Sequence, residues 1–344
     1  MLIAKTKQGD DILAQEASKG RNYHCGGCGQ PVILKKGLQK EAHFAHKKAA
    51  DCQLFSEAET AEHLRLKKHF KKWLGNAAVL EAYLPQLKQR PDILQQEEKL
   101  AIEIQCSVLS IEKLIERTCT YRDQGYDCWW ILGNRFMQNH AFTQLEKSCC
   151  MYTKQRGIHS WKADLANGKL HLFHHISEMP VLKMRYHEST WDFYETDLLQ
   201  LRNQQIICCQ EKEKSSSTEG GTDYHRWLKQ QLRRKQKRIL SLQEKCYLRQ
   251  KHLLHLPKWL YSKSRYFFFY QERLFYHRLL FEETASLDRK RHYECWEKEI
   301  NRQKEPWLFP LVDEKQIRKG FFEECIRLFE KSESSKILHT HSLV

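Results

Sequence analysis

Apolar residues follow first a strand-like and then a helical spacing along the chain. Residues 1–55 contain short apolar runs separated by a glycine-rich turn, which predicts a small β-rich module. Residues 56–75 carry apolar side chains at the spacing of one helical face, and Gly75 follows as a helix-stop residue. Glu62 and His63 lie on the same stripe near its start. We therefore predict a helix at the beginning of the second part of the chain.

Strands and one further helix are predicted between residues 78 and 133. The strands cover 78–84, 90–95, 99–107 and 127–133, and the helix covers 110–125. Ser110 is the expected N-cap of that helix. The order is helix, three strands, helix, strand. Because a helix between strands must be a crossover, we predict an α/β fold with a mixed sheet.

The pattern weakens after residue 150. The runs 169–176 and 181–187 are candidate paired strands, and most of the chain after residue 223 has a helical pattern. Residues 210–222 are polar and rich in glycine and serine, as in a linker. We thus expect a β module at 1–55, an α/β domain at 56–150 and a mostly helical, basic C-terminal domain at 151–344.

Composition adds a strong positive charge to this picture. Lys and Arg total 58 against 43 Asp and Glu, so the formal net charge is +15, and the mean hydropathy is -0.72. No apolar run approaches a membrane span and no signal peptide is recognisable, so we expect a soluble cytoplasmic protein with mostly reduced cysteines. The charge favours a polyanionic partner such as nucleic acid, with a merely solvated basic surface as the alternative.

A cluster of metal-ligating residues lies in the N-terminal module. Cys25 and Cys28 flank two glycines, and His46 and Cys52 follow at a distance that allows a tetrahedral site. His43 and His46 face opposite sides of a strand, and we favour His46 as the ligand. Four protein ligands leave no open position, so the expected role is structural Zn²⁺. The alternative is that the cysteines are small buried residues.

A second candidate site lies in the segment 89–107. Period-two alternation places Glu103 and Gln105 on one face of a strand, and a turn returns the chain so that Asp92 comes near Glu103. Two converging carboxylates favour a hard cation such as Mg²⁺ (or Mn²⁺), and Glu62 is a further candidate ligand. The alternative is that Glu103 faces solvent and Asp92 forms the turn.

These residues resemble the core of the PD-(D/E)XK nucleases, in which an Asp and a Glu bind the metal. Asp92 in "RPDI" and Glu103 in "IEIQ" match that motif, whereas Gln105 stands where the family usually has a lysine. The resemblance implies a metal-dependent deoxyribonuclease with Asp92, Glu103, Gln105 and Glu62 as catalytic residues. With Gln105, the motif lacks a charged side chain at this position to orient the attacking water.

A wider resemblance covers essentially the whole chain. "CGGC", "HFAH", "RPDI" and the run from "IEIQCS" to "WWILG", followed by a basic helical part, are similar to the competence protein CoiA family of naturally transformable bacteria. This implies processing or recombination of incoming DNA, with recombination or uptake proteins as further partners. Arg117 and Tyr121 match the family motif as well. Arg117 is a candidate phosphate contact, or it forms an Arg–Tyr pair that braces the sheet.

A basic helix is predicted at 226–251, with ten Lys or Arg, one acid and an apolar stripe. DNA is its expected partner, and charge for solubility alone is the alternative. The candidate DNA-binding residues of this helix are Arg226, Lys229, Arg233, Arg234, Lys237 and Arg238. The aromatic run 264–281 is expected to form core rather than to stack on bases.

The sequence therefore favours a Mg²⁺-dependent endonuclease that acts on DNA during transformation and recombination. The first alternative is a nuclease fold that binds DNA without cutting it. The second is a scaffold that recruits recombination proteins through its C-terminal helices.

Overall fold

The computed structural model describes residues 1–37, 40–46, 60–137, 141–179, 184–203 and 220–341, and the chain divides into two units. The first unit comprises Met1–His175, Tyr186–Ile207 and Leu308–Leu311. The second comprises Ile176–Arg185, Cys208–Trp307 and Val312–Val344. In the described ranges, no helix has the length and apolar character needed to cross a bilayer.

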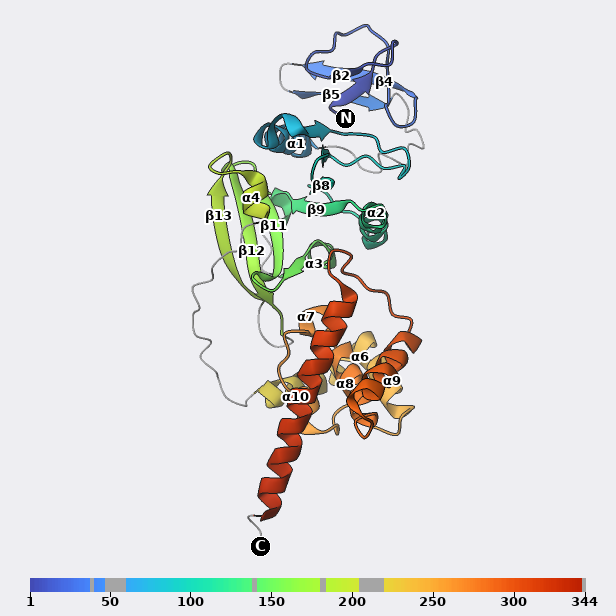
Figure 1. Cartoon of the computed structure of the whole chain (residues 1–344), viewed down its shortest axis with the longest axis vertical. Coiled ribbons are helices and arrows are strands. Elements are labelled where there is room, and N and C mark those ends of the chain that lie inside the picture. The colour runs from blue at the N-terminus through green and yellow to red at the C-terminus, as the bar shows by residue number, and fades with distance from the viewer. Residues whose placement is uncertain (38–39, 47–59, 138–140, 180–183, 204–219, 342–344) are drawn as a thin grey trace. The chain divides into compact units, whose positions relative to one another are not determined.

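Five short antiparallel strands form the N-terminal sheet, drawn in blue in Figure 1. In the order β2-β1-β3-β4-β5 they are Asp11–Leu13, Ile3–Lys5, Tyr23–His24, Pro31–Gly37 and Lys40–His46. Alternate side chains of β4 and β5 point inward, so that Val32 and Phe44 pack with Tyr23 and Ala4 in a small core. This core holds the turn that carries Cys25.

The first helix, α1, covers Ala61–Leu74. The Thr60 side chain accepts a hydrogen bond from the backbone N–H of His63 and begins the helix, and Gly75, with φ +72°, ends it. Leu64, Leu66 and Phe70 face the core. The predicted helix is confirmed, and its first turn begins where the described residues resume after residue 59.

A mixed eight-stranded sheet forms the centre of the first unit, in the order β13-β12-β11-β9-β8-β7-β6, with β10 paired to β11. Its first four strands along the chain are β6 Ala78–Leu80, β7 Ile93–Gln95, β8 Leu100–Gln105 and β9 Asp127–Leu132. β6, β7 and β8 are antiparallel neighbours, whereas β8 and β9 run parallel. Helix α2, Ile111–Asp123, connects those parallel strands and begins at the predicted N-cap Ser110. The predicted mixed sheet is confirmed.

Helices cover both faces of the central strands, and this explains why all six residues of β8 are buried. Ile102 and Ile104 pack with residues of α1 such as Leu64 and Phe70. Ala101 lies in the other cluster with Tyr121 of α2. Glu103 therefore does not face solvent: it is 1% exposed, which contradicts the simple interpretation of an exposed strand residue.

The sheet continues past residue 150. The additional strands are β10 Met151–Thr153, β11 Gly157–Asp164, β12 Lys169–Ser177 and β13 Arg185–Asp192. β12 and β13 are neighbours, so the predicted strand pair is confirmed, while β10 and β11 were not predicted. The short helices of this unit are α3 Gln144–Ser148 and α4 Leu198–Asn203, with single 3₁₀ turns at Gly75–Ala77 (η1) and Asn134–Phe136 (η2).

The second unit is helical, as predicted for the C-terminal region. Its helices are α5 Gly220–Arg233, α6 Lys237–Tyr247, α7 Phe267–Tyr270, α8 Arg273–Glu283, α9 Arg289–Arg302 and α10 Glu314–His341, with a 3₁₀ turn at Lys258–Tyr261 (η3). Phe268, Phe275 and Leu279 are at most 1% exposed, so the aromatic run forms core as expected.

The predicted basic helix is two helices rather than one. The break lies between Arg233 and Lys237, where Lys235 has φ +52°, a left-handed conformation that ends α5. The expected linker at 210–222 lies mostly outside the described residues, and α5 already begins at Gly220 within it.

Candidate functional site

Asp92 immediately precedes the first residue of β7, and β7 pairs with β8. Because Ile93 pairs with Ile102, the antiparallel register places residue 92 opposite Glu103. One Asp92 oxygen, Oδ2, accepts hydrogen bonds from His63 Nε2 at 2.9 Å and from the backbone N–H of Ile104 at 2.8 Å. Burial alone would raise the pKa of Asp92, but the charges of His63 and Lys67 outweigh burial and hold this pKa well below its usual range.

Glu103 is held from the opposite face of the sheet. Its Oε1 accepts hydrogen bonds from the Arg117 guanidinium at 2.5 Å and from the Tyr121 hydroxyl at 2.7 Å, both on α2. Burial raises the pKa of Glu103 to about 7, and the charge of Asp92 adds to the increase against the opposing charge of Arg117. Arg117 and Tyr121 thus hold Glu103 in place. This agrees with the interpretation that they form a pair that braces the sheet, rather than with a phosphate contact of Arg117.

A buried lysine links this site to the N-terminal sheet. Lys67 of α1 is fully buried, and its ammonium lies 2.5 Å from Glu81 Oε1 and 3.5 Å from Asp92 Oδ1. Glu81, which follows β6, also accepts hydrogen bonds from the backbone N–H groups of Leu2 and Ile3. Burial opposes ionisation of Glu81, but Arg90 and Lys67 hold its pKa well below the usual range.

Glu62 contacts a residue far away in the sequence, whereas Gln105 contacts a near neighbour. Glu62 Oε1 accepts a hydrogen bond of 2.6 Å from the backbone N–H of Asn134, after β9. The Gln105 amide donates to the backbone oxygen of Ser107 at 3.0 Å and to the Ser107 hydroxyl oxygen at 3.3 Å. In the described part of the chain, the predicted set of Glu62, Asp92 and Glu103 is not brought within common ligand distance.

The chemistry of Asp92 and Glu103 is compatible with a divalent cation. Among the described residues, hydrogen bonds to these carboxylates use Asp92 Oδ2 and Glu103 Oε1, and Asp92 Oδ1 lies 3.5 Å from the Lys67 ammonium. Mg²⁺ commonly takes one or two carboxylates and completes its coordination with water. The two carboxylates are held from opposite layers, Asp92 by α1 and Glu103 by α2.

The N-terminal sheet brings together three of the four predicted zinc ligands. One ligand atom each of Cys25, Cys28 and His46 lies within 4.8 Å of the other two, and Cys28 Sγ is 3.3 Å from His46 Nε2. Gly29, with φ +71°, closes the turn by donating its N–H to the Cys25 oxygen. His43 instead contacts the Glu41 backbone oxygen, so the structure favours His46. Cys52 lies outside the described residues.

The candidate DNA-binding side chains of the second unit are all exposed. They occupy α5, the break that follows it and the start of α6: Arg226, Lys229, Arg233, Arg234, Lys237 and Arg238. Leu228 and Ile239 of the same segments are at most 3% exposed, so the apolar stripe packs inward and leaves the cations outside.

Lys67 and Glu81 are the site residues that the sequence did not predict. Lys67 follows His63 by four residues, and this spacing puts both side chains on one helical face. That face carries Leu64 and Phe70 as well, so a lysine within it indicates a buried partner. No comparable signal marked Glu81, because its partners come from α1 and from the N-terminus.

Comparisons with known proteins agree with this architecture. The family model "Competence protein CoiA, nuclease-like domain" matches residues 59–206, and "Competence protein CoiA, N-terminal domain" matches residues 6–55. Competence protein CoiA of Bacillus subtilis (strain 168) is 36% identical over 120 residues, which cover 33% of this chain and 32% of that protein. No solved structure gave a significant match. The chain, with its N-terminal sheet and its nuclease-like α/β domain, belongs to the competence protein CoiA family.

Proposed function

We propose that this protein processes DNA during competence and recombination as a divalent-metal-dependent endonuclease of the PD-(D/E)XK type. The observation that carries the proposal is the register of β7 and β8, which places Asp92 opposite the buried Glu103. The element order α1, β6, β7, β8, α2, β9 supports the same assignment. So does the match to a nuclease-like family model.

In this proposal Asp92 and Glu103 would hold the ion. A bound Mg²⁺ or Mn²⁺ would lower the pKa of a water ligand and shield the charge that develops on the phosphodiester. Lys67 supplies a fixed positive charge beside Asp92 Oδ1. The residue two positions after Glu103, usually a lysine in the PD-(D/E)XK motif, is Gln105 in this chain. His63 keeps the other Asp92 oxygen in place. Arg117 and Tyr121 orient Glu103.

The exposed cations of α5 and α6 provide the expected DNA contact in the second unit. The triad of Cys25, Cys28 and His46 is proposed to bind structural Zn²⁺ together with Cys52. Recombination or uptake proteins remain proposed partners, and the cytoplasm remains the proposed location.

The decisive experiment measures both cleavage and binding. Labelled single-stranded, duplex and branched DNA is incubated with the full chain, with and without Mg²⁺ or Mn²⁺. We expect metal-dependent cleavage that Asp92→Asn and Glu103→Gln each reduce by about a hundredfold or more, while DNA affinity stays within about twofold. Gln96→Ala, an exposed residue of the turn after β7, is the control. Wild-type protein that cuts none of these DNAs contradicts the proposal.

A second candidate is a DNA-binding protein with the same fold and no cleavage. The observation in its favour is that Arg117 and Tyr121 already satisfy Glu103 from α2, so the buried carboxylate has a partner without a metal. Salt-dependent DNA binding without turnover, unchanged by Asp92→Asn, selects this candidate. A scaffold role predicts instead that partner proteins are lost when residues 223–344 are deleted while DNA affinity persists.

A further inference from the structure

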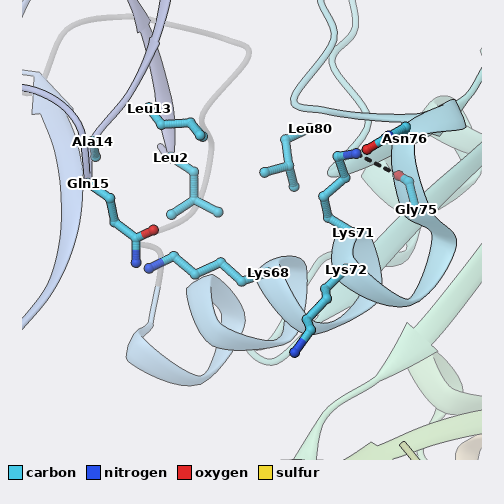
Figure 2. Close-up of a pocket in the computed structure, with 10 residues that line it drawn as sticks. All are labelled: Leu2, Leu13, Ala14, Gln15, Lys68, Lys71, Lys72, Gly75, Asn76 and Leu80. Carbon is cyan, nitrogen blue, oxygen red and sulfur yellow. Dashed lines mark hydrogen bonds between the residues drawn. The ribbon is translucent and has the colours of Figure 1, made fainter. Parts of the chain in front are cut away.

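A pocket beside α1 and a group of histidines on β12 and β13 lie outside the sites described so far. The pocket has a volume of about 320 Å³, and its lining residues include no imidazole, thiol or carboxylate. Figure 2 shows that the Lys71 ammonium donates to the backbone oxygen of Gly75, at the end of the helix. The histidines, in contrast, offer ligand atoms for a metal ion.

The histidine group begins near the end of β12, where two neighbouring rings meet. Successive side chains of a regular strand point to opposite faces of the sheet. His175 departs from this pattern because its φ is +50°, a left-handed conformation that is uncommon for residues other than glycine. His174 Nδ1 and His175 Nδ1 lie 2.8 Å apart. The irregular backbone at His175 therefore brings two imidazoles together.

The neighbouring strand β11 holds His175 in this conformation. The backbone N–H of His175 donates to the Arg156 oxygen at 2.7 Å. Gly157 allows the close approach, since a Cβ there would lie 3.4 Å from the His175 Cα and 3.7 Å from its ring atom Cδ2. A left-handed conformation costs a residue with a side chain roughly 1–3 kcal/mol, and such strain is concentrated at functional sites.

A third ring comes from β13, the next strand of the sheet. The His187 ring stacks on His174 with centroids 5.6 Å apart. The His175 centroid lies 5.1 Å from that of His174 and 5.9 Å from that of His187. An ion about 2.0–2.1 Å from a ring nitrogen lies about 3.2 Å from the ring centre, so rings around a tetrahedral ion have centres about 5.2 Å apart. The three observed separations are close to this value.

One of the three rings has to turn to complete a metal site. In the described part of the chain, the Nδ1 atoms of His174 and His175 already converge, whereas the nitrogens of His187 are not within common ligand distance of both. His187 is exposed, and rotation about its Cβ–Cγ bond meets only a low barrier. A half turn moves Nδ1 by about 2 Å while the ring centre stays nearly in place.

The two rings of β12 are neutral at pH 7 and keep a lone pair for a metal. Burial lowers the pKa of His174 to about 4, and the neighbouring His175 and His187 add to the decrease. Burial also lowers the pKa of His175, with a further contribution from His187. His174 Nε2 lies 3.2 Å from the Ser189 hydroxyl oxygen, and this contact orients the ring with Nδ1 toward His175.

We propose that His174, His175 and His187 bind Zn²⁺ or a chemically similar divalent ion. Imidazole nitrogens suit Zn²⁺, Cu²⁺ and Ni²⁺, whereas Mg²⁺ prefers oxygen ligands. Three protein ligands leave the fourth position open for water or a substrate, unlike the closed site proposed for the N-terminal sheet. The ion joins the end of β12 to the beginning of β13. This site does not depend on the proposed nuclease activity.

The test measures Zn²⁺ binding by the full chain in excess Mg²⁺, which keeps sites for hard cations occupied. The protein is first dialysed against metal-free buffer, because three imidazoles without a thiolate release Zn²⁺ more readily than a site with cysteines. We expect titration calorimetry to show one equivalent of Zn²⁺ that binds again. Co²⁺ gives a second readout: the ion should absorb in the visible range without the near-ultraviolet band that thiolate ligands produce.

Two variants identify the ligands, and a third serves as the control. His175→Gly should fold at least as well as the wild type, because glycine adopts φ +50° readily, yet bind Zn²⁺ about a hundredfold more weakly. His187→Gln changes an exposed residue and should weaken binding by about tenfold or more without loss of stability. His171→Gln alters another histidine of β12, whose ring contacts Glu188, and should bind Zn²⁺ as the wild type does. Circular dichroism checks the folding of each variant.

Two further variants separate this site from the other candidate metal sites. Cys28→Ser and Asp92→Asn should each leave the Zn²⁺ equivalent in place. An equivalent that disappears in one of them belongs to the N-terminal sheet or to the carboxylates and overturns the inference. Binding that is unchanged in either histidine variant, or no Zn²⁺ uptake in excess Mg²⁺, overturns it as well. The nuclease proposal is judged separately, by DNA cleavage.

Discussion

At the scale of single residues, the notable feature is a set of charges that share one buried neighbourhood. Lys67 and Glu81 have side chains that are 1% exposed, and Asp92 completes the set at 15%. Charges at such depth are tolerated only when they are paired and hydrogen-bonded, because desolvation costs several kcal/mol for each ion. Lys67 has a carboxylate on either side, and Glu81 has two cations and two backbone N–H groups.

Removing the Lys67 charge should therefore be far more damaging than removing an exposed neighbour. We expect Lys67→Met to lower the free energy of unfolding by about 3–5 kcal/mol, since it leaves Glu81 and Asp92 buried without their shared cation. Lys68→Met, on the same helix but in a partly exposed pair with Glu41, should cost about 1 kcal/mol or less. Urea unfolding monitored by circular dichroism measures both. Equal effects of the two changes would show that the buried network contributes little.

Gly133 tests the position assigned to Glu62. A Cβ at Gly133 would lie 2.6 Å from Glu62 Oε1 and 2.7 Å from Cys106 Sγ, so one of those side chains must move. We expect Gly133→Ala to destabilise the protein by about 1–3 kcal/mol. The control is Gly37→Ala, where the added Cβ meets nothing within 4 Å. A Gly133→Ala protein as stable as the control would mean that Glu62 does not occupy this place.

At the scale of elements, the N-terminal sheet has a core too small to hold it firmly. Its strands are 2 to 7 residues long, and its buried cluster consists mainly of small side chains with Tyr23 and Phe44 as the large members. Modules of this size usually need a staple. The Cys25–Cys28 turn, which follows β3, and His46 at the end of β5 meet where a metal ion would join the middle of this sheet to its edge strand.

Metal removal should thus unfold this sheet selectively. We expect one Zn²⁺ per chain by elemental analysis, and its removal by a strong chelator should abolish hydrogen-exchange protection in β3, β4 and β5. Cys28→Ser should lower the metal content in the same way, whereas Cys119→Ser on α2 should leave it unchanged. Full protection in metal-free protein would contradict a structural role for the ion.

At the scale of the whole molecule, each unit places ionisable groups in its core, and these groups set the pH range of stability. His277 of α8 is 3% exposed and packs against Tyr270 and Phe321. Burial, together with the charge of Arg273, lowers the pKa of His277 to about 3. The unfolded chain has a histidine pKa near 6.5. The unfolded state therefore takes up the proton first as the pH falls, and folding stability is lost from about pH 6.5 downward.

This linkage predicts a measurable contribution of His277 to the acid sensitivity of folding. Between pH 7 and pH 5 the wild-type protein should lose about 2 kcal/mol of stability through His277 alone. His277→Gln should lower stability at both pH values but remove this part of the difference between them. His255→Gln, at an exposed position, should leave the difference as it is. Chemical denaturation at the two pH values gives the comparison, and an unchanged difference in His277→Gln would refute the assignment.

The sequence by itself determined the local elements and the chemical types of the candidate ligands. Caps, glycines and apolar spacing act over a few residues, so α1, α2 and the strands β6 to β9 could be predicted, as could the pair Cys25 and Cys28. The nearly continuous apolar run at 127–133 is also typical of a strand covered on both faces, and β9 is buried from Cys128 to Leu132.

Only the tertiary structure decided which groups meet. The break between α5 and α6 and the strands β10 and β11 depend on backbone conformation and pairing between distant segments. The same holds for Lys67 between Glu81 and Asp92, and for Glu103 under Arg117. A local sequence pattern indicates only that a side chain faces inward. Its partner is set by the packing of helices on opposite faces of one sheet, and that packing brings together residues far apart in the chain.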